Sequence, residues 1–212
     1  MGLIKAHRQK FATVFWDEDT QIDFISPEGK LYVPGAEAIV PNLKILTLLA
    51  KEHGIPVLAS TDAHRTDDSE MAVYPLHCLI GTAGQEKVEG TLLPKRIVIP
   101  NHLVQLPTDF SEYDQIILQK QDVDVFTNPN IENLLSKLGS PQFVLYGVVT
   151  EICVAIAARG LLNLGYKVEV VEDAIRSFDA AKGAAALDEI QKMGGTLVAT
   201  DQVVARYAGV PR

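Results

Sequence analysis

Short apolar runs alternate with longer segments of helical periodicity along most of the chain, and this alternation restricts the fold more than any other sequence feature. The run from Ala12 to Asp17 (ATVFWD) is typical of a buried strand. The segment from Ala36 to His53 then carries apolar residues at helical spacing and meets a stop at Gly54. Because parallel strands are buried on both faces, they form continuous apolar runs like these. The pattern predicts an α/β fold in which helices flank a parallel sheet.

The same alternation continues toward the C-terminus. Further strands are expected at Ile55 to Ser60, Gln115 to Gln119, Phe143 to Val149, Lys167 to Val171 and Thr196 to Ala199. Helices are expected at Asn130 to Leu138, Glu151 to Leu164 and Ala180 to Met193. Helical connections of this kind join parallel strands, because a tight turn cannot.

Residues 84–112 depart from the alternation. Pro94, Pro100 and Pro107 surround the short strand-like run RIVIP. We interpret this stretch as an irregular excursion or a small hairpin rather than as a domain. A chain of 212 residues has the size of one α/β domain, so a single domain over residues 1–212 is expected.

Charge and hydropathy exclude several classes of function. The chain has 19 basic and 27 acidic residues, a net charge of -8, which disfavours a nucleic-acid-binding surface. Its longest apolar stretches are far shorter than the ~20 residues that span a bilayer, so no membrane association is expected. The N-terminal MGLIKAHRQK has too short an apolar segment for a signal peptide. Cys78 and Cys153 are therefore expected to be reduced thiols in the cytoplasm.

Reactive side chains follow the expected strands where each strand ends. Asp19 follows the first strand, Asp62 and His64 follow the second, and Lys120 and Cys153 follow the next two. Ligands of parallel sheets bind beyond the carboxyl ends of the strands, which meet at one edge. The sequence therefore predicts that an acid, a lysine, a thiol and a metal-ligating pair share one cleft.

Three of these side chains suggest nucleophilic catalysis, although each has an ordinary structural interpretation. Cys153 lies where a strand passes into a helix, and the positive end of a helix favours a thiolate; otherwise a buried cysteine is a small packing residue. Asp19 is a candidate for the base that takes the thiol proton, but aspartates are commoner in turns, and Asp17 and Asp23 compete for this role. Lys120 either stabilises charge at the site or is a solvated lysine.

Asp62, His64 and His77 form a candidate metal site. Two imidazoles and a carboxylate leave a divalent cation open to water and substrate. Glu70 is a possible fourth ligand, and its alternative is an exposed loop acid. Asp-x-His is a weak motif by itself, so the prediction depends on its neighbours.

Seven segments of the chain resemble the isochorismatase-like cysteine hydrolases, and the nicotinamidases most closely. In chain order they are DTQIDF, LYVPGAEAIVPN, STDAH, YPLHCLIGTAGQE, LQKQDVDVF, YGVVTEICV and VVEDA. The resemblance implies a three-layer α/β/α fold with a central, mostly parallel sheet of about six strands. It also implies a catalytic triad of Asp19, Lys120 and Cys153, with a cis peptide bond between Val148 and Val149. The backbone N–H groups of Val149 and Cys153 would form the oxyanion hole.

The resemblance further implies a divalent metal ion, zinc before iron or manganese. Its ligands correspond to Asp62, His64 and His77, with Glu70 as the fourth ligand of some members. The aromatic walls for a pyridine ring correspond to Phe24 and Tyr74. Some residues depart from the family pattern: Tyr74, where tryptophan is common; Asp124 and Val125, where Ser-Ala usually precedes the equivalent of Phe126; and the long proline-rich stretch.

The activity that the resemblance implies is hydrolysis of nicotinamide to nicotinate and ammonia through a thioester on Cys153. Homo-oligomers are common in the family, so one is expected here. Two other functions stay open. One is hydrolysis of a carbamoyl, ureido or other small amide by the same chemistry, and the other is a non-catalytic member that binds a small ligand.

Overall fold

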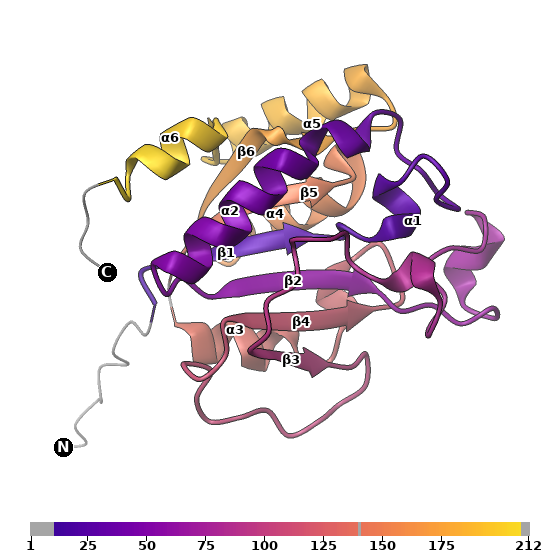
Figure 1. The fold of residues 1–212 in the computed structure, drawn as a ribbon, viewed down its shortest axis with the longest axis horizontal. Helices are drawn as coiled ribbons and strands as arrows, with labels where there is room; N and C mark the ends of the chain where they lie inside the picture. The colour runs from indigo at the N-terminus through magenta and orange to yellow at the C-terminus, as the bar shows by residue number, and fades with distance from the viewer. Residues whose placement is uncertain (1–10, 140, 209–212) are drawn as a thin grey trace.

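The structure, a computed structural model, describes residues 11–139 and 141–208 and is built on one seven-stranded sheet. The strands are parallel throughout and run in the order β3-β4-β2-β1-β5-β6-β7 (Figure 1). The predicted parallel sheet flanked by helices is confirmed, with seven strands where about six were expected. Residues 1–10, from which we predicted that the chain has no signal peptide, lie outside the described residues.

The strands follow the predicted apolar runs to within a few residues, with one extension. They are β1 (Thr13–Glu18), β2 (Val57–Asp62), β3 (Arg96–Ile99), β4 (Gln115–Lys120), β5 (Gln142–Val148), β6 (Lys167–Arg176) and β7 (Thr196–Val198). The extension is in β6, which continues past Val171 although Glu172 and Asp173 are exposed. The apolar pattern stops at Val171, whereas the pairing with β5 resumes after a register shift and reaches Arg176.

The interpretation of residues 84–112 as an excursion or hairpin is wrong for the run RIVIP. Its residues form β3, which pairs in parallel with β4 from Arg96 opposite Gln115 to Ile99 opposite Leu118. An edge strand needs only one apolar face, and β3 buries Ile99 while leaving Val98 exposed. The surrounding prolines lie outside the paired residues, where they remove no sheet hydrogen bond.

Helices connect the strands on both faces. They are α1 (Ile22–Ile25), α2 (Val40–Glu52), α3 (Ile131–Leu138), α4 (Ala155–Asn163), α5 (Ala180–Lys192) and α6 (Thr200–Ala205). Short 3₁₀ turns are η1 (Ala36–Ile39), η2 (Ser69–Ala72), η3 (Ala83–Gln85) and η4 (Val125–Thr127), and η5 (Thr150–Val154) is a π-turn. The helices predicted at 36–53 and 151–164 therefore begin with η1 and η5, and the short α1 and α6 had no periodic signal to predict them.

Two apolar cores lie on opposite faces of the sheet. Successive residues of β1 alternate between them, so that Phe15 packs against α2 while Trp16 packs against α3 and α4. Figure 1 shows α2 in front of the sheet and α3 and α4 behind it. Ile190 of α5 joins the core of Trp16, and Val203 of α6 joins that of Phe15. The fold thus has the predicted three layers.

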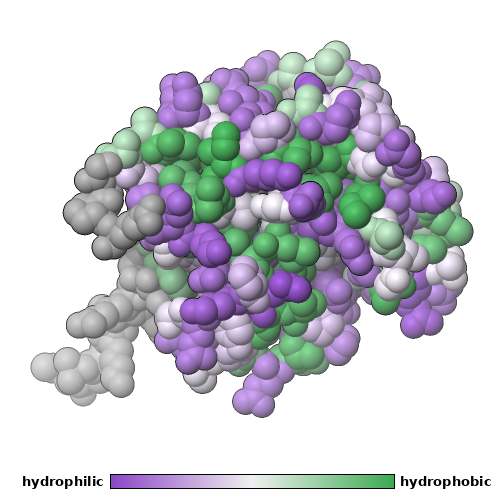
Figure 2. Space-filling model, viewed as in Figure 1, coloured by the Kyte–Doolittle hydropathy of each residue, from purple (hydrophilic) through white to green (hydrophobic). Residues whose placement is uncertain are grey.

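The outer surface of the α2 face mixes apolar and polar residues. Ile45 and Leu48 of α2 are exposed, and Figure 2 shows green patches on this face interrupted by purple, hydrophilic residues. Among residues 11–139 and 141–208, no helix combines the length and the apolar character that crossing a membrane requires.

The strand order places β1 in the centre, between β2 and β5. The chain leaves β1 for β2 on one side and later returns to β5 on the other. This change of direction opens a crevice at the carboxyl ends of β1 and β5, which is where ligands of such sheets bind. Asp19 follows β1 and Cys153 follows β5, so the fold brings two predicted site residues to this crevice.

Candidate active site

Lys120 is the centre of the predicted triad. It is the last residue of β4 and is fully buried. Its Nζ lies 2.8 Å from Asp19 Oδ2 and 2.5 Å from Asp62 Oδ1, and it donates to Cys153 Sγ at 3.9 Å. The structure therefore brings Asp19, Lys120 and Cys153 together, although they come from three different strand ends.

The ammonium of Lys120 and the carboxylates around it share one electrostatic environment. Burial lowers the pKa of Lys120, but the charges of Asp19 and Asp62 outweigh it and hold this pKa well above its usual value. Burial raises the pKa of Asp19 to about 6, against the opposing charge of Lys120. Burial raises the pKa of Asp62, but the charge of Lys120 and the neighbouring His64 and His77 outweigh it, so this pKa is lowered instead.

The buried environment of Cys153 disfavours the thiolate form. Burial raises the pKa of its thiol well above the usual value, although Lys120 opposes this shift. The positive end of a helix favours a thiolate, but burial opposes it more strongly here. Cys153 lies inside the π-turn η5 and is 6% exposed, so loss of solvation exceeds the stabilisation by nearby N–H groups. Deprotonation requires a nearby base.

The backbone before Cys153 has the predicted cis peptide bond, between Val148 and Val149. The Val149 carbonyl accepts hydrogen bonds from the N–H groups of Ile152 and Val154, each at 3.1 Å. Neither donor is one of the two N–H groups expected in the oxyanion hole. Val149 and Cys153 both line one small cavity.

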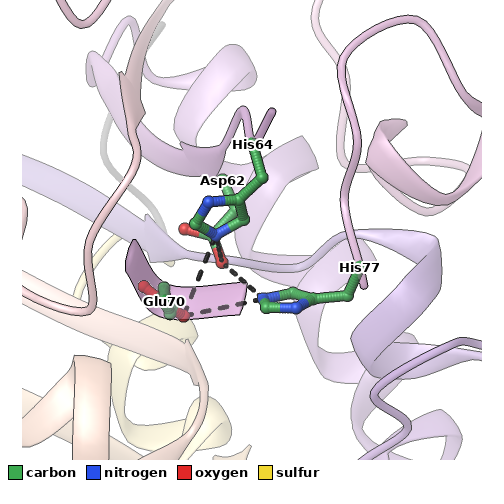
Figure 3. Close-up of side chains that lie close together, drawn as sticks. All are labelled: Asp62, His64, Glu70 and His77. Atoms are coloured by element: carbon green, nitrogen blue, oxygen red, sulfur yellow. Dashed lines mark ion pairs between the residues drawn. The ribbon is translucent and has the colours of Figure 1, made fainter. Parts of the chain in front are cut away.

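A second cluster lies on the other side of Asp62. One oxygen or nitrogen atom from each of Asp62, His64, Glu70 and His77 lies within 4.8 Å of the others (Figure 3). The Nε2 atoms of His64 and His77 are 3.5 Å and 3.4 Å from Asp62 Oδ2. They are 3.8 Å and 3.7 Å from Glu70 Oε1. All four predicted metal ligands thus converge, Glu70 included.

Both imidazoles of this cluster are oriented by hydrogen bonds on their far side. His77 Nδ1 is 2.8 Å from the Pro75 carbonyl oxygen, which only accepts, so Nδ1 carries the proton. His64 Nδ1 is 3.2 Å from Asp68 Oδ2, a carboxylate in the same role. The Nε2 atoms of both rings are buried and have no hydrogen-bond partner among the described residues. Free Nε2 lone pairs, oriented by the hydrogen-bond acceptors at Nδ1, fit a divalent metal ion.

The aspartates that competed with Asp19 have other partners. Asp17 Oδ2 is 2.9 Å from Lys87 Nζ, and its Oδ1 accepts from the Thr20 hydroxyl at 2.7 Å. Asp23 accepts from the backbone N–H groups of Cys78 at 2.7 Å and Lys30 at 3.0 Å. Both are fixed as structural acids.

Gln21 holds the end of β2 in place, a role that sequence reasoning missed. Its side-chain N–H donates to the Asp62 and Gln85 carbonyls, both at 2.8 Å, and its carbonyl oxygen accepts from the Asp62 N–H at 2.7 Å. Asp23 in turn holds the segment that carries His77, through Cys78. The available signal was the polar spacing of Asp19, Gln21 and Asp23 in DTQIDF.

The cavity beside Cys153 has a mostly apolar wall. Its volume is only about 10 Å³, and it reaches both Cys153 and the acids Asp62 and Glu70. The predicted wall residues Phe24 and Tyr74 line it, with ring centres 5.2 Å and 6.4 Å from that of His77. The other apolar lining residues, which the sequence did not indicate, are Leu31, Val123, Ile152 and Phe178.

The departure at Asp124 preserves the local structure. Asp124 Oδ1 accepts a hydrogen bond from the Phe126 N–H at 2.9 Å and so begins the η4 turn, as a serine would. Phe126 then packs against Gly160 of α4, where a Cβ atom would overlap its ring. The aspartate replaces the usual residue as a cap.

An isochorismatase domain model matches residues 12–202, nearly the whole described chain. The chain belongs to the isochorismatase family. Its relatives include the nicotinamidase of Saccharomyces cerevisiae, 25% identical over 186 residues, 74% of this chain and 85% of that protein. A probable inactive nicotinamidase of Arabidopsis thaliana is also 25% identical, over 74% of this chain and 76% of that protein.

Among solved structures of the family, the pyrazinamidase of Pyrococcus horikoshii in complex with zinc has a TM-score of 0.73. It is 25% identical in sequence, and the match covers 89% of this chain and 99% of that one. The isochorismatase-like fold and the place of this chain in a family of hydrolases are therefore established.

Proposed function

We propose that this protein is a nicotinamidase, which hydrolyses nicotinamide to nicotinate and ammonia with Cys153 as nucleophile. The contact set of Lys120 carries the proposal. Its ammonium touches Asp19, Asp62 and Cys153, so the nucleophile and its base lie beside the four-residue metal cluster. The relatives that are nicotinamidases and pyrazinamidases support the same substrate class.

Asp62, His64, Glu70 and His77 would hold a divalent metal ion in this protein. Two neutral imidazoles and two carboxylates suit zinc, and they also suit iron and manganese. The zinc of the Pyrococcus pyrazinamidase supports zinc here. When bound, the metal supplies a Lewis acid with positions open to a water or to a ring nitrogen.

The acylation half of the reaction begins with the neutral thiol. The Asp19 carboxylate accepts the proton of the Cys153 thiol, and the sulfur forms a bond to the amide carbon. The carbonyl π electrons move to the oxygen and give a tetrahedral oxyanion. The C–N bond then breaks as Asp19 returns its proton to the nitrogen, which leaves as ammonia. A nicotinoyl thioester on Cys153 remains.

Deacylation repeats these steps with water. Asp19 accepts a proton from a water molecule, whose oxygen bonds to the thioester carbon. The C–S bond breaks when the second tetrahedral intermediate collapses, and Asp19 returns the proton to sulfur. Nicotinic acid leaves and ionises in solution. One water is consumed and one ammonia released per turnover, so the atoms balance.

Backbone N–H groups and Lys120 stabilise the charges that form in these steps. We assign the oxyanion hole to the N–H groups of Val149 and Cys153, and loss of one such donor typically costs about 3 kcal/mol of transition-state stabilisation. Lys120 keeps its positive charge throughout, because its pKa is far above neutrality. It offsets the negative charge as that charge moves between Asp19 and Cys153.

Phe24 and Tyr74 are proposed to hold the flat pyridine ring. Both line the cavity, and both rings lie beside His77, a metal ligand in this scheme. A ring held between aromatic side chains would present its carboxamide to Cys153.

The test is ammonia release from nicotinamide by the purified protein, with metal content measured on the same sample. Cys153→Ala should lower the rate on the order of 10⁴-fold or more while the metal content is retained. The matched control is Cys78→Ala, because Cys78 is also buried but contacts the Gly84 carbonyl and not Lys120. Equal turnover in the two variants would refute the covalent scheme.

The same samples separate the rival functions. A metal-free protein that does not hydrolyse nicotinamide but releases ammonia from carbamoyl or ureido compounds would indicate a different amidase. A protein with neither activity and with a thiol of ordinary alkylation rate would indicate a ligand-binding member. His77→Ala should lower the metal content, whereas His102→Ala, at an exposed histidine, should not.

A further inference from the structure

Glu18 is a buried carboxyl group that the proposed reaction does not use. It is the last residue of β1, directly before Asp19, and lies opposite Ser60 of β2 and Gly147 of β5. Its side chain is fully buried, and neither carboxyl oxygen has a hydrogen-bond partner among the described residues. A buried carboxyl without partners is costly, so its presence at this position calls for a functional explanation.

The groups around Glu18 leave it without a cation of its own. An oxygen of Glu18, an oxygen of Asp19 and Cys153 Sγ all lie within 4.8 Å of one another. The charge of Lys120 acts on Glu18, but its Nζ contacts Asp19 and Asp62 instead. A negative charge on Glu18 would therefore be a third carboxylate around one ammonium, in a buried site.

The remaining neighbours do not change this balance. Ser60 is a hydroxyl on β2 that favours the ionised form, as does Lys120, but burial and the charges of Asp19 and Asp62 raise the pKa of Glu18 well above its usual value. A protonated carboxyl is an O–H donor. Asp19 Oδ1, on the adjacent residue, is a buried acceptor with no hydrogen-bond partner among residues 11–139 and 141–208.

We propose that Glu18 is a positioning residue, a neutral carboxylic acid whose O–H donates a hydrogen bond to the Asp19 carboxylate. At rest the two carboxyl groups hold one proton, on Glu18, and Asp19 stays free to accept the proton of Cys153. After that transfer both carboxyl groups are neutral, and the thiolate faces the Lys120 ammonium, which still pairs with Asp62. This assignment rests on the proposed role of Asp19 as base in the amide hydrolysis.

Two substitutions of Glu18 distinguish a neutral donor from an anion. Glu18→Met removes the donor and is similar in size, so a neutral Glu18 predicts that the Asp19 carboxylate loses stabilisation. The acid limb of the pH profile then moves up, by about one pH unit for one hydrogen bond to a charged group. An anionic Glu18 predicts the opposite, because Glu18→Met then removes a like charge and moves the limb down.

Glu18→Gln provides the conservative rescue. Its amide N–H donates to Asp19 as the protonated acid does, so the acid limb should stay at its native pH. If Glu18 is an anion, Glu18→Gln and Glu18→Met should instead move the limb in the same downward direction. The matched control is Glu112→Gln, which changes the same formal charge at an exposed position.

Each pH profile is measured in two ways: as kcat/KM for ammonia release from nicotinamide, and as the rate of Cys153 alkylation by iodoacetamide. The alkylation profile needs no turnover, so it tests Glu18 even if nicotinamide is not the substrate. Thermal unfolding and metal content, measured on every variant, identify one that has lost its fold. An upward shift in Glu18→Met with a native limb in Glu18→Gln supports the proposal, and any downward or absent shift in a folded Glu18→Met protein overturns it.

Discussion

Asp62 holds the Lys120 ammonium with one carboxylate oxygen and faces His64 and His77 with the other. Its Oδ1 is 2.5 Å from Lys120 Nζ, while its Oδ2 is 3.4 Å from His77 Nε2. One buried side chain therefore connects the proposed metal site to the nucleophile and its base. A change in charge at the proposed metal site therefore changes the electrostatic potential at Lys120, and the reverse also holds, because the protein interior screens charges weakly.

Lys87 and Lys120, both buried, allow the effect of charge on activity to be separated from its effect on stability. Lys120 pairs with Asp19 and Asp62, and Lys87 pairs with Asp17. Breaking a buried pair leaves an uncompensated charge and typically costs about 3–5 kcal/mol, so Lys120→Met and Lys87→Met should each lower the free energy of unfolding by this order. Urea unfolding of the two variants measures this loss of free energy of unfolding.

The activities of these two variants should differ. Lys120→Met should lose amide hydrolysis, because nothing then offsets the charge on Asp19 and Cys153. Lys87→Met, measured below its unfolding transition, should keep turnover, because Lys87 contacts Asp17 and Thr20 and lies outside the proposed triad. Equal loss of activity in both would show that Lys120 acts only through stability.

The pH dependence of activity should follow Asp19. Its pKa is raised to about 6, chiefly by burial, and only its ionised form can accept the thiol proton. We expect kcat/KM to fall as the pH decreases through about 6. An acid limb near the ordinary aspartate pKa of about 4 would contradict the role of Asp19 as base.

The same shift affects stability with a definite sign. The pKa of Asp19 is higher in the folded state, about 6, than the roughly 4 of an unfolded aspartate, so the folded protein binds more protons between these values. Its contribution is fully present below pH of about 4 and is lost as the pH rises through about 6. We expect Asp19→Asn to remove this part of the pH dependence, which urea unfolding at several pH values measures.

Asp68 should control metal affinity without contacting the metal. Its carboxylate lies 3.2 Å from His64 Nδ1 and fixes that ring. Loss of the hydrogen-bond partner that orients a metal-binding histidine typically weakens metal binding by about 10–100-fold, which we expect for Asp68→Ala. The control is Asp67→Ala, since Asp67 is exposed and its ion pair is with Arg65. Zinc titration against a competing chelator would show equal affinities if His64 is not a ligand.

Gly147 should be intolerant of a side chain. Its φ is +118°, and a Cβ atom there would overlap the carbonyl oxygen of Glu18. Glu18 directly precedes Asp19, so a shift of this backbone would move the proposed base. We expect Gly147→Ala to lower the free energy of unfolding by about 3 kcal/mol or more and to lower activity.

The control for this substitution is Gly54→Ala. Gly54 also has a positive φ, +62°, but open space at its Cβ position. Gly54→Ala should lower the free energy of unfolding by only about 1 kcal/mol, the typical cost of the left-handed backbone for a residue with a Cβ. Similar losses at the two positions would mean that the overlap at Gly147 relaxes easily.

The apolar runs were sufficient to predict the sheet and most of its helices. Strands buried on both faces have a strong and local signal, so β1, β2, β4 and β5 lie close to their predicted positions. The edge strand β3 was misread because it buries only one face, and the prolines near it suggested a hairpin. The short helices α1 and α6 contain too few residues to show a period.

The site was predicted in its reactive side chains but not in its supporting ones. Reactive residues after parallel strands are expected at one edge, which predicted that Asp19, Lys120 and Cys153 lie together. The choice of Asp19 over Asp17 and Asp23 came from the family resemblance. Glu18 looked like part of a strand end, and Gln21 like an ordinary polar residue. Their importance comes from burial and from partners far along the chain, such as Asp62 for Gln21.

The sequence by itself determined the layered α/β fold and which reactive residues lie at the carboxyl edge, because both follow from local periodicity and strand direction. Only the tertiary structure decided their protonation and pairing. Burial raises the pKa of the Cys153 thiol, Lys120 pairs with Asp19 and Asp62, and neither carboxyl oxygen of Glu18 has a hydrogen-bond partner among the described residues. Charges respond to burial and to neighbours within a few ångströms, and these are properties of the packed interior rather than of any segment.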